Sequence, residues 1–181
     1  MKPDEPEARE AGPDAADAED PDEADLDKAD LAACCASRRW LAAVTAGPAR
    51  DLAALRATSR RMVMDELDWA DIEEALAAHP RIGERARGDA REAGWSRDEQ
   101  SGVDDADADI RAALAEGNRA YEERFGHVFL IRASGRTAAE MLRELRTRLG
   151  NDVETERRVV RAELAGIVDL RLRKLAGERG A

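Results

Sequence analysis

Two short segments of the sequence carry the side chains best suited to acid–base chemistry. His79, one of only two histidines in 181 residues, stands directly before Pro80, and a segment with Ser96, Glu99 and Gln100 begins 17 positions later. A proline pushes the preceding residue out of helical geometry, so His79 is expected at a helix end. The pattern Ser96-x-x-Glu99 is typical of a helix start. Rigid helix ends can thus hold a proton-transfer pair, which predicts a small-molecule active site.

Each of these side chains also has an ordinary structural explanation. A histidine near a helix C-terminus is favoured by the helix dipole. In a capping box the carboxylate of Glu99 accepts a hydrogen bond from the backbone amide of the capping residue, and Ser96 and Gln100 are common helix-start residues. The second histidine, His127, is interpreted as a packing or supporting residue. Spacing alone does not decide between these explanations and catalysis.

Helical periodicity dominates the chain after residue 30. Proline and glycine end the predicted helices at Gly47-Pro48, Pro80 and Gly150, and Thr137-x-x-Glu140 is a second capping box. The stretch 128–131 is extended but has no predicted strand to pair with, so we expect an all-α, single-domain bundle of about seven helices without a sheet. The helices are predicted over about 27–46, 49–66, 68–77, a short one from 96, 105–125, 137–149 and 152–176, with a loop over 81–94.

The last predicted helix has a cation within its apolar stripe. At about 100° per residue, Arg171 falls near the centre of the stripe. Its head can reach solvent or a core carboxylate, or it can receive a substrate carboxylate or imide oxygen, which suits its fork geometry. Arg157 lies on the same face, so the stripe alone does not choose. The apolar members are Val153, Val160, Leu164, Ile167, Val168 and Leu175.

Acidic residues are concentrated at the N-terminus. Residues 1–30 contain thirteen acidic and three basic residues, whereas residues 31–181 contain 27 and 26. A segment with four prolines and Leu26 as its only large apolar residue after Met1 cannot bury enough surface to offset the entropy of ordering. We therefore expect a disordered acidic tail over 1–30 and a folded domain over 31–181.

The folded part excludes several classes of function. Cys34 and Cys35 are adjacent and point apart on a helix, which suits a reducing cytoplasm. No apolar run approaches the ~20 residues of a membrane span, and no signal peptide is evident. Near-neutral charge argues against nucleic acid as a partner. The histidines and cysteines lack zinc-like spacing, so no metal is expected.

Five segments, in order and at plausible intervals, together resemble a known enzyme family. The family is 2-oxo-4-hydroxy-4-carboxy-5-ureidoimidazoline (OHCU) decarboxylase, of the bacterial type, the last enzyme of the route from urate to allantoin. The resemblance covers about residues 31–176. The segments are HPRIG at 79–83, SRDEQSGV at 96–103, NRAYEERFGHVFLIRA at 118–133, RLGND at 148–152 and LRLRKL at 170–175.

The resemblance implies roles for individual residues. It makes His79 the catalytic acid, with Pro80 lining the site. It also implies catalytic contributions from Glu99 and Arg171, the arginine that the stripe indicated independently. The second segment implies substrate contacts by Ser96, Arg97, Asp98, Glu99 and Gln100. The extended stretch implies backbone contacts at Phe129, Leu130, Ile131, Arg132 and Ala133.

The implied chemistry suits these residues. Loss of CO2 leaves electron density on a ring carbon, from which it delocalises into the neighbouring imine and carbonyl, so no cofactor is expected. Arg171 and the amides near Ile131 would hold the oxygens that gain charge. His79, with an ordinary pKa of about 6.5, would protonate one face of the ring, and Glu99 would orient the imidazole or bind a substrate group.

The sequence also departs from the family pattern. An acidic tail replaces the usual N-terminal segment with aromatic and asparagine residues. Arg81-Ile82 replaces the Asp-Leu that follows HP in animal members, and the chain ends in Arg-Gly-Ala instead of a peroxisomal tripeptide. These features indicate a cytoplasmic member, and the family implies a homodimer acting on a small-molecule substrate.

Two other classes of function stay open at this point. One is another cofactor-free lyase or hydrolase on the same scaffold. The other is a non-catalytic helical interaction module, which predicts an exposed apolar groove without convergent polar groups. The enzyme hypothesis instead requires His79, Glu99 and Arg171 to meet at one pocket.

Overall fold

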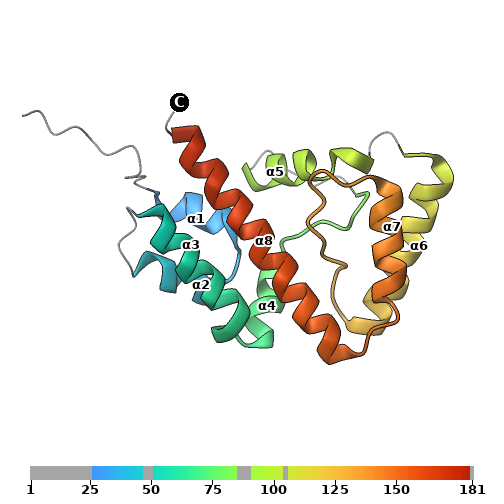
Figure 1. The fold of residues 1–181 in the computed structure, drawn as a ribbon, viewed down its shortest axis with the longest axis horizontal. Helices are drawn as coiled ribbons and strands as arrows, with labels where there is room; N and C mark the ends of the chain where they lie inside the picture. The colour runs from blue at the N-terminus through green and yellow to red at the C-terminus, as the bar shows by residue number, and fades with distance from the viewer. Residues whose placement is uncertain (1–25, 47–50, 85–90, 104–105, 180–181) are drawn as a thin grey trace, which may run out of the picture.

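The computed structural model describes residues 26–46, 51–84, 91–103 and 106–179. These ranges contain eight α-helices, a π-helical segment and a 3-10 turn, and no strand (Figure 1). The predicted all-α fold is therefore confirmed. In this part of the chain, no helix has both the length and the apolar character needed to cross a membrane.

The N-terminal half contains one more helix break than the sequence pattern predicts. The single helix expected over 27–46 is two helices, because Cys35 is extended and the side chain of Ser37 accepts the amide of Trp40 as an N-cap. The predicted helix start at 68 is confirmed, because Asp68 is the N-cap of the helix that follows and Asp71 completes a capping box. The elements are α1 (Lys28–Cys34), α2 (Arg38–Thr45), α3 (Leu52–Arg61), the π-helical η1 (Met62–Glu66) and α4 (Trp69–Leu76).

In the C-terminal half the helix predicted to start at Ser96 starts earlier. Helix α5 spans Arg91–Glu99, so Ser96 lies inside it and Glu99 ends it. Burial of Ala93 and Trp95 extends the helix upstream, and this tertiary packing overrides the local capping signal. The capping box at Thr137 is confirmed. The remaining elements are η2 (Ser101–Val103), α6 (Ala108–Phe125), α7 (Ala138–Arg148) and α8 (Val153–Arg179).

The long helix α8 runs diagonally between two groups of helices (Figure 1). On one side it packs with α1 to α4 in an N-terminal core. On the other side lie α6 and α7, which form a C-terminal core with the extended segment 128–133. Side chains of an extended segment alternate in direction, so Leu130 joins the N-terminal core while Phe129 and Ile131 join the C-terminal core. This segment therefore marks the boundary between the two cores.

The folded domain begins earlier than its predicted boundary. Leu26 is only 4% exposed and belongs to the N-terminal core. The side chain of Asp27 caps α1 by accepting the amide of Asp30 at 2.8 Å. A buried leucine and a helix cap thus bring residues 26–30 into the fold, which corrects the predicted boundary at 30. The rest of the predicted tail, 1–25, lies outside the described residues.

Candidate active site

His79 lies just beyond the end of α4, where Pro80 prevents the helix from continuing. Its amide donates to the Leu76 carbonyl at 2.9 Å, and its ring Nδ1 lies 2.9 Å from the Ala75 carbonyl. A carbonyl only accepts, so Nδ1 carries the proton and Nε2 presents a lone pair. Nε2 is buried and has no partner among the residues that the structure describes. The imidazole is therefore oriented by α4 and leaves one nitrogen available for chemistry.

The environment of His79 favours its neutral form. Burial lowers its pKa to about 4, and the nearby positive charge of Arg171 acts in the same direction, whereas the Ala75 carbonyl opposes the shift. The ordinary value of about 6.5 that we assumed from the sequence is thus wrong for the folded protein. At neutral pH the ring is uncharged, and the lone pair of Nε2 is free to accept a hydrogen bond from a ligand.

Arg171 and Glu99 form a buried ion pair beside this histidine. The Arg171 guanidinium donates to both Glu99 carboxylate oxygens, at 3.2 and 3.1 Å, and to the Ser96 hydroxyl at 3.2 Å. A longer bond of 3.5 Å reaches the Ala33 carbonyl. The Arg171 side chain is 1% exposed and that of Glu99 is 10% exposed. Glu99 therefore pairs across the core and does not close a capping box.

The three chemistry-bearing side chains meet at one pocket. It lies where α5, the end of α4, the segment 128–133 and α8 come together. The space between its side chains is about 20 Å³, so they must move apart to admit a ligand larger than a few atoms. The predicted site residues that line it are His79, Pro80, Ser96, Glu99, Gln100, Phe129, Leu130, Ile131, Ala133 and Arg171.

Three residues of the predicted site lie elsewhere. The side chains of Arg97 and Asp98 are exposed on α5, because residues 96, 99 and 100 occupy the inward face of that helix. Arg132 is exposed too and lines a different cavity, against Gly166 of α8. It alternates in direction with Ile131 and Ala133, which face the pocket. The side chains of these three residues thus do not line the pocket, and the backbone contact expected at Arg132 stays a prediction.

Two apolar residues of the pocket were missed by the sequence reasoning. Ile82 lines it from the HPRIG segment, and Ile167 lines it one turn before Arg171 on α8. Ile167 belongs to the apolar stripe, so its spacing from Arg171 was a usable signal. Val153, in contrast, was assigned to the stripe but is 50% exposed. Arg157 lies over the ring of Trp69 at 4.7 Å and not in the pocket.

Hydrogen bonds from two helices hold the HPRIG loop against the pocket. The Gln100 side-chain oxygen accepts the amide of Gly83 at 3.0 Å, and Asn118 donates to the Ile82 carbonyl at 2.8 Å. Gly83 has φ +86, which a side chain would disfavour. Arg81 is bidentate to Glu122 of α6, at 2.6 and 2.7 Å. The loop that follows His79 is thus fixed on both sides.

A second buried ion pair supports the extended segment from behind and was also missed. Arg148 donates to the Glu156 carboxylate from Nε at 2.8 Å and from Nη2 at 2.6 Å, and from Nη1 to the Leu130 carbonyl at 2.8 Å. Tyr121 donates its hydroxyl to Glu156, and Asn151 donates to it at 2.7 Å. Arg148 follows Met141 and Leu145 at helical spacing, so its inward position could be read from the sequence.

His127 packs against aromatic rings, as expected. Its ring centroid lies 5.2 Å from that of Trp69 and 5.5 Å from that of Tyr121. Among the described residues, no group of three or more histidine, cysteine or acidic side chains could hold a metal ion. The titratable side chains that line the pocket are the His79 imidazole, the Glu99 carboxylate and the Arg171 guanidinium.

The fold and the pocket together define an all-α domain that brings an imidazole, a carboxylate and a guanidinium to one buried place. Residues 22–173 match the family model described as OHCU decarboxylase. The chain belongs to the OHCU decarboxylase family.

Individual relatives agree with this assignment. The chain is 33% identical over 151 residues to the uric acid degradation bifunctional protein TTL of Arabidopsis thaliana, covering 81% of this chain and 46% of that protein. It is 34% identical over 116 residues to a 2-oxo-4-hydroxy-4-carboxy-5-ureidoimidazoline decarboxylase of Mus musculus, covering 63% and 65%. The chain thus spans about half to two thirds of these curated relatives.

A solved structure of an OHCU decarboxylase in the presence of (S)-allantoin has a similar fold. The TM-score is 0.72 at 30% sequence identity, and the match covers 82% of this chain and 98% of that one. The likeness therefore extends over nearly all of that domain.

Proposed function

We propose that this protein is a carboxy-lyase that converts OHCU to (S)-allantoin in urate degradation, and that the pocket at His79 is its active site. The observation that carries the proposal is the unpartnered Nε2 of His79, held at the pocket that Arg171 and Glu99 also line. Membership of the OHCU decarboxylase family supports the choice of substrate. The reaction needs no cofactor, because the substrate ring itself accepts the electron pair.

The first step is the loss of CO2 from the substrate carboxylate. The carbon–carbon bond breaks, and its electron pair passes into the ring, where the neighbouring imine delocalises it. Arg171 can bind the anionic substrate through a planar fork whose N–H groups already face Glu99 and Ser96. A guanidinium at this buried place stabilises charge that develops on the ring with little reorganisation.

The second step adds a proton to a ring carbon. Decarboxylation consumes one proton overall, since a C–H bond replaces the bond to a carboxylate that leaves as neutral CO2. His79 is neutral before the substrate binds. A substrate carboxylate offsets the charge of Arg171 and raises the proton affinity of Nε2. Substrate binding thus allows His79 to take up the proton that it later delivers to one face of the ring.

Glu99 and the backbone complete the site in this proposal. Glu99 holds the Arg171 fork in place and accepts an N–H or hydroxyl of the substrate. Backbone groups of Leu130 to Ala133 contact the ring, and Pro80 and Phe129 limit its position. Delivery of the proton from one fixed imidazole explains how a single allantoin enantiomer would form.

The proposal is tested by His79→Asn in an assay with freshly made substrate. Urate is converted by the two upstream enzymes, and formation of (S)-allantoin is followed by circular dichroism. We expect accelerated turnover to fall by about 10²-fold or more, the range for loss of a general acid–base group, with helicity unchanged. His127→Asn, the other histidine, is the control and should retain activity in its folded fraction. Activity of His79→Asn within about tenfold of wild type would remove His79 from the reaction.

We also propose that the protein works as a homodimer in the cytoplasm. Buried, reduced Cys34 and Cys35 suit a reducing compartment, and the family resemblance supports the dimer. Light scattering on a size-exclusion column measures the mass directly, and a monomer at micromolar concentration would contradict the dimer.

A further inference from the structure

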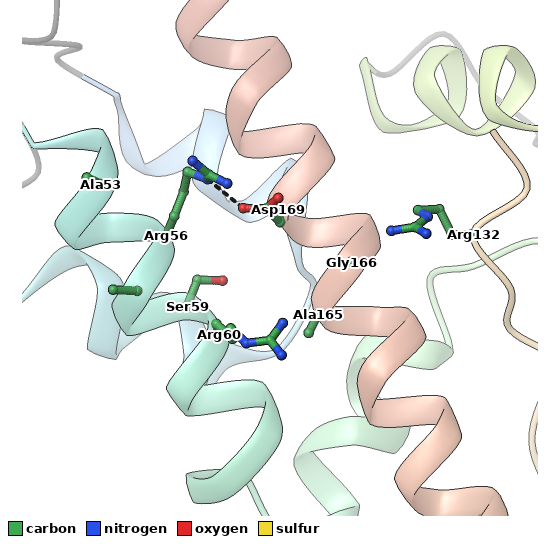
Figure 2. Close-up of a pocket in the computed structure, with 9 residues that line it drawn as sticks. Ala53, Arg56, Ser59, Arg60, Arg132, Ala165, Gly166 and Asp169 are labelled. Carbon is green, nitrogen blue, oxygen red and sulfur yellow. Dashed lines mark hydrogen bonds and ion pairs between the residues drawn. The ribbon is translucent and has the colours of Figure 1, made fainter. Parts of the chain in front are cut away.

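A second cavity lies on the other side of α8 from the proposed active site. It has a volume of about 380 Å³, within the range of small-molecule sites. Figure 2 shows Arg56 and Arg60 reaching toward α8 from α3, and Arg132 reaching toward Gly166 of α8 from the opposite side. Three guanidinium groups from two separate segments thus line one cavity.

The charges at this cavity are not balanced. Only Asp169 opposes the three arginines that line it, and Asp169 already pairs with Arg56 at 2.5 Å and with Arg173. The side chains of Arg60 and Arg132 have no ion pair or hydrogen bond to any described residue. The Glu163 carboxylate lies near Arg132 but accepts its backbone amide, at 2.8 Å. The lining residues therefore carry two surplus positive charges.

The backbone leaves room for an anion beside these side chains. Arg56 and Arg60 stand four residues apart on one face of α3, so both reach the cavity from the same side. Gly166 lets the Arg132 guanidinium approach α8, since a Cβ there would lie 3.2 Å from its Nη1. Small side chains of Ala53, Ala57 and Ala165 leave the hollow open between the cations.

We propose that this cavity binds a small oxyanion carrying phosphate or carboxylate groups. Guanidinium forks match the planar or tetrahedral oxygen pairs of both groups. Arg56 is already neutralised by Asp169, so Arg60 and Arg132 carry the surplus charge and are the principal ligands. The inference does not depend on the proposed catalytic activity, because none of these side chains lines the pocket at His79.

The site is adjacent to the proposed active site through two segments of chain. Ile131 and Ala133 line the catalytic pocket on either side of Arg132. Ile167 of α8 lines it as well, directly after Gly166. An anion that fixes Arg132 would therefore restrain the same extended segment that is expected to contact the substrate.

Isothermal titration calorimetry with pyrophosphate and with citrate, at constant ionic strength, tests the proposal. We expect saturable binding of at least one probe with Kd below about 1 mM, and weakening by about tenfold or more in both Arg60→Gln and Arg132→Gln, as for loss of one charge-assisted hydrogen bond. Arg146→Gln on α7 removes the same charge from an exposed residue and should bind as wild type does. A preference for one probe assigns the phosphate or the carboxylate class.

Three outcomes would overturn the proposal. One is the absence of saturable binding of either probe up to about 10 mM, beyond which affinity is too weak for a specific site. Another is binding that neither Arg60→Gln nor Arg132→Gln weakens, which would place the anion elsewhere, for example at Arg171. The third is equal weakening by Arg146→Gln, which would mean a general charge effect. Melting temperatures of all variants show that each is folded.

Discussion

Two buried arginine–glutamate pairs, Arg148–Glu156 and Arg171–Glu99, use the same chemical groups in different ways. Both guanidinium groups are almost fully buried, at 2% and 1% exposure. Arg148 makes short bonds of 2.6 to 2.8 Å to Glu156, whereas Arg171 makes bonds of 3.1 to 3.2 Å to Glu99. The Glu156 side chain is 1% exposed and that of Glu99 is 10% exposed. The first pair is closed, and the second borders a pocket.

The difference also appears in the other partners of each pair. Glu156 accepts from Tyr121 and Asn151 as well, and the Arg148 guanidinium stacks 4.7 Å from the Phe129 ring. The other hydrogen bonds of Arg171 go to the Ser96 hydroxyl and, at 3.5 Å, to the Ala33 carbonyl. A closed network specifies a structure, and a loosely satisfied pair can exchange partners with a ligand. A buried ion pair is therefore informative about function only together with its bond lengths and its access.

Breaking the closed pair should have the largest effect on stability. Arg148→Met leaves the Glu156 carboxylate buried without its cation and the Leu130 carbonyl without a donor. We expect a loss of about 3–5 kcal/mol in the free energy of unfolding, measured by urea denaturation. Arg148→Met combined with Glu156→Gln should recover part of that loss. A single variant as stable as wild type would mean that the pair is not a structural centre.

The pocket at His79 and the Arg148–Glu156 pair should also lose stability in different pH ranges as the solution is acidified. Burial holds the pKa of His79 at about 4 in the folded protein, below the ordinary 6.5 of the unfolded chain. Only the unfolded chain binds this proton between those values, so stability falls as the pH drops from about 6.5 to 4, by about 3 kcal/mol in total. Burial lowers the pKa of His127 too, which adds a loss in the same direction. His79→Asn should make the dependence shallower, as measured by urea titrations at several pH values.

The Arg148–Glu156 pair should lose its contribution to the stability of the fold at a lower pH than His79 does. Burial alone would raise the pKa of the Glu156 carboxyl, but hydrogen bonds from Arg148, Tyr121 and Asn151 together bring it below its ordinary value. A carboxylate with a lowered pKa stabilises the fold above its unfolded value of about 4.3 and stops doing so as pH falls through its folded pKa. Glu156→Gln lacks this carboxylate, so we expect it to be less stable than wild type near neutral pH, and the difference to shrink as the pH falls below about 4. Urea titrations in which the difference stays constant into strong acid would contradict the assignment.

Substitution of Arg171 should cost less stability and more activity. Arg171→Met leaves Glu99 beside a pocket from which it can reach water, so we expect a loss of about 1–2 kcal/mol, less than for Arg148→Met. Arg171→Lys keeps the charge but loses the fork, and turnover should fall by about tenfold or more while stability changes little. Equal destabilisation by Arg171→Met and Arg148→Met would show that both pairs are structural. Retained turnover in Arg171→Lys would exclude Arg171 as a substrate receptor.

The sequence predicted the helical fold and most of the residues that line the pocket, but not the Arg148–Glu156 pair that lies behind it. The apolar stripe of α8 places Arg171 inward, and Pro80 ends the helix before His79, because both signals are local. The start of α5 was predicted wrongly, since burial of Trp95 depends on distant partners. The low pKa of His79 was missed for the same reason, because burial and the Arg171 charge come from other helices. The outward direction of the Arg132 side chain could have been predicted, because side chains alternate along the extended segment and Ile131 and Ala133 point inward.

The smallest effect is expected from Tyr121→Phe, which removes one hydroxyl from the closed network and keeps the ring. Glu156 retains Arg148 and Asn151 as donors, so no charge is left unpaired. We expect a loss of about 1 kcal/mol in the free energy of unfolding, the usual value of one buried hydrogen bond. Turnover should stay near that of wild type, because Arg148 still donates to the Leu130 carbonyl that lies behind the pocket. Urea denaturation and the circular dichroism assay measure the two quantities on the same preparation. A large fall in turnover at nearly unchanged stability would mean that this network tunes the proposed active site directly, and that the contrast between a closed and an open arginine centre is incomplete.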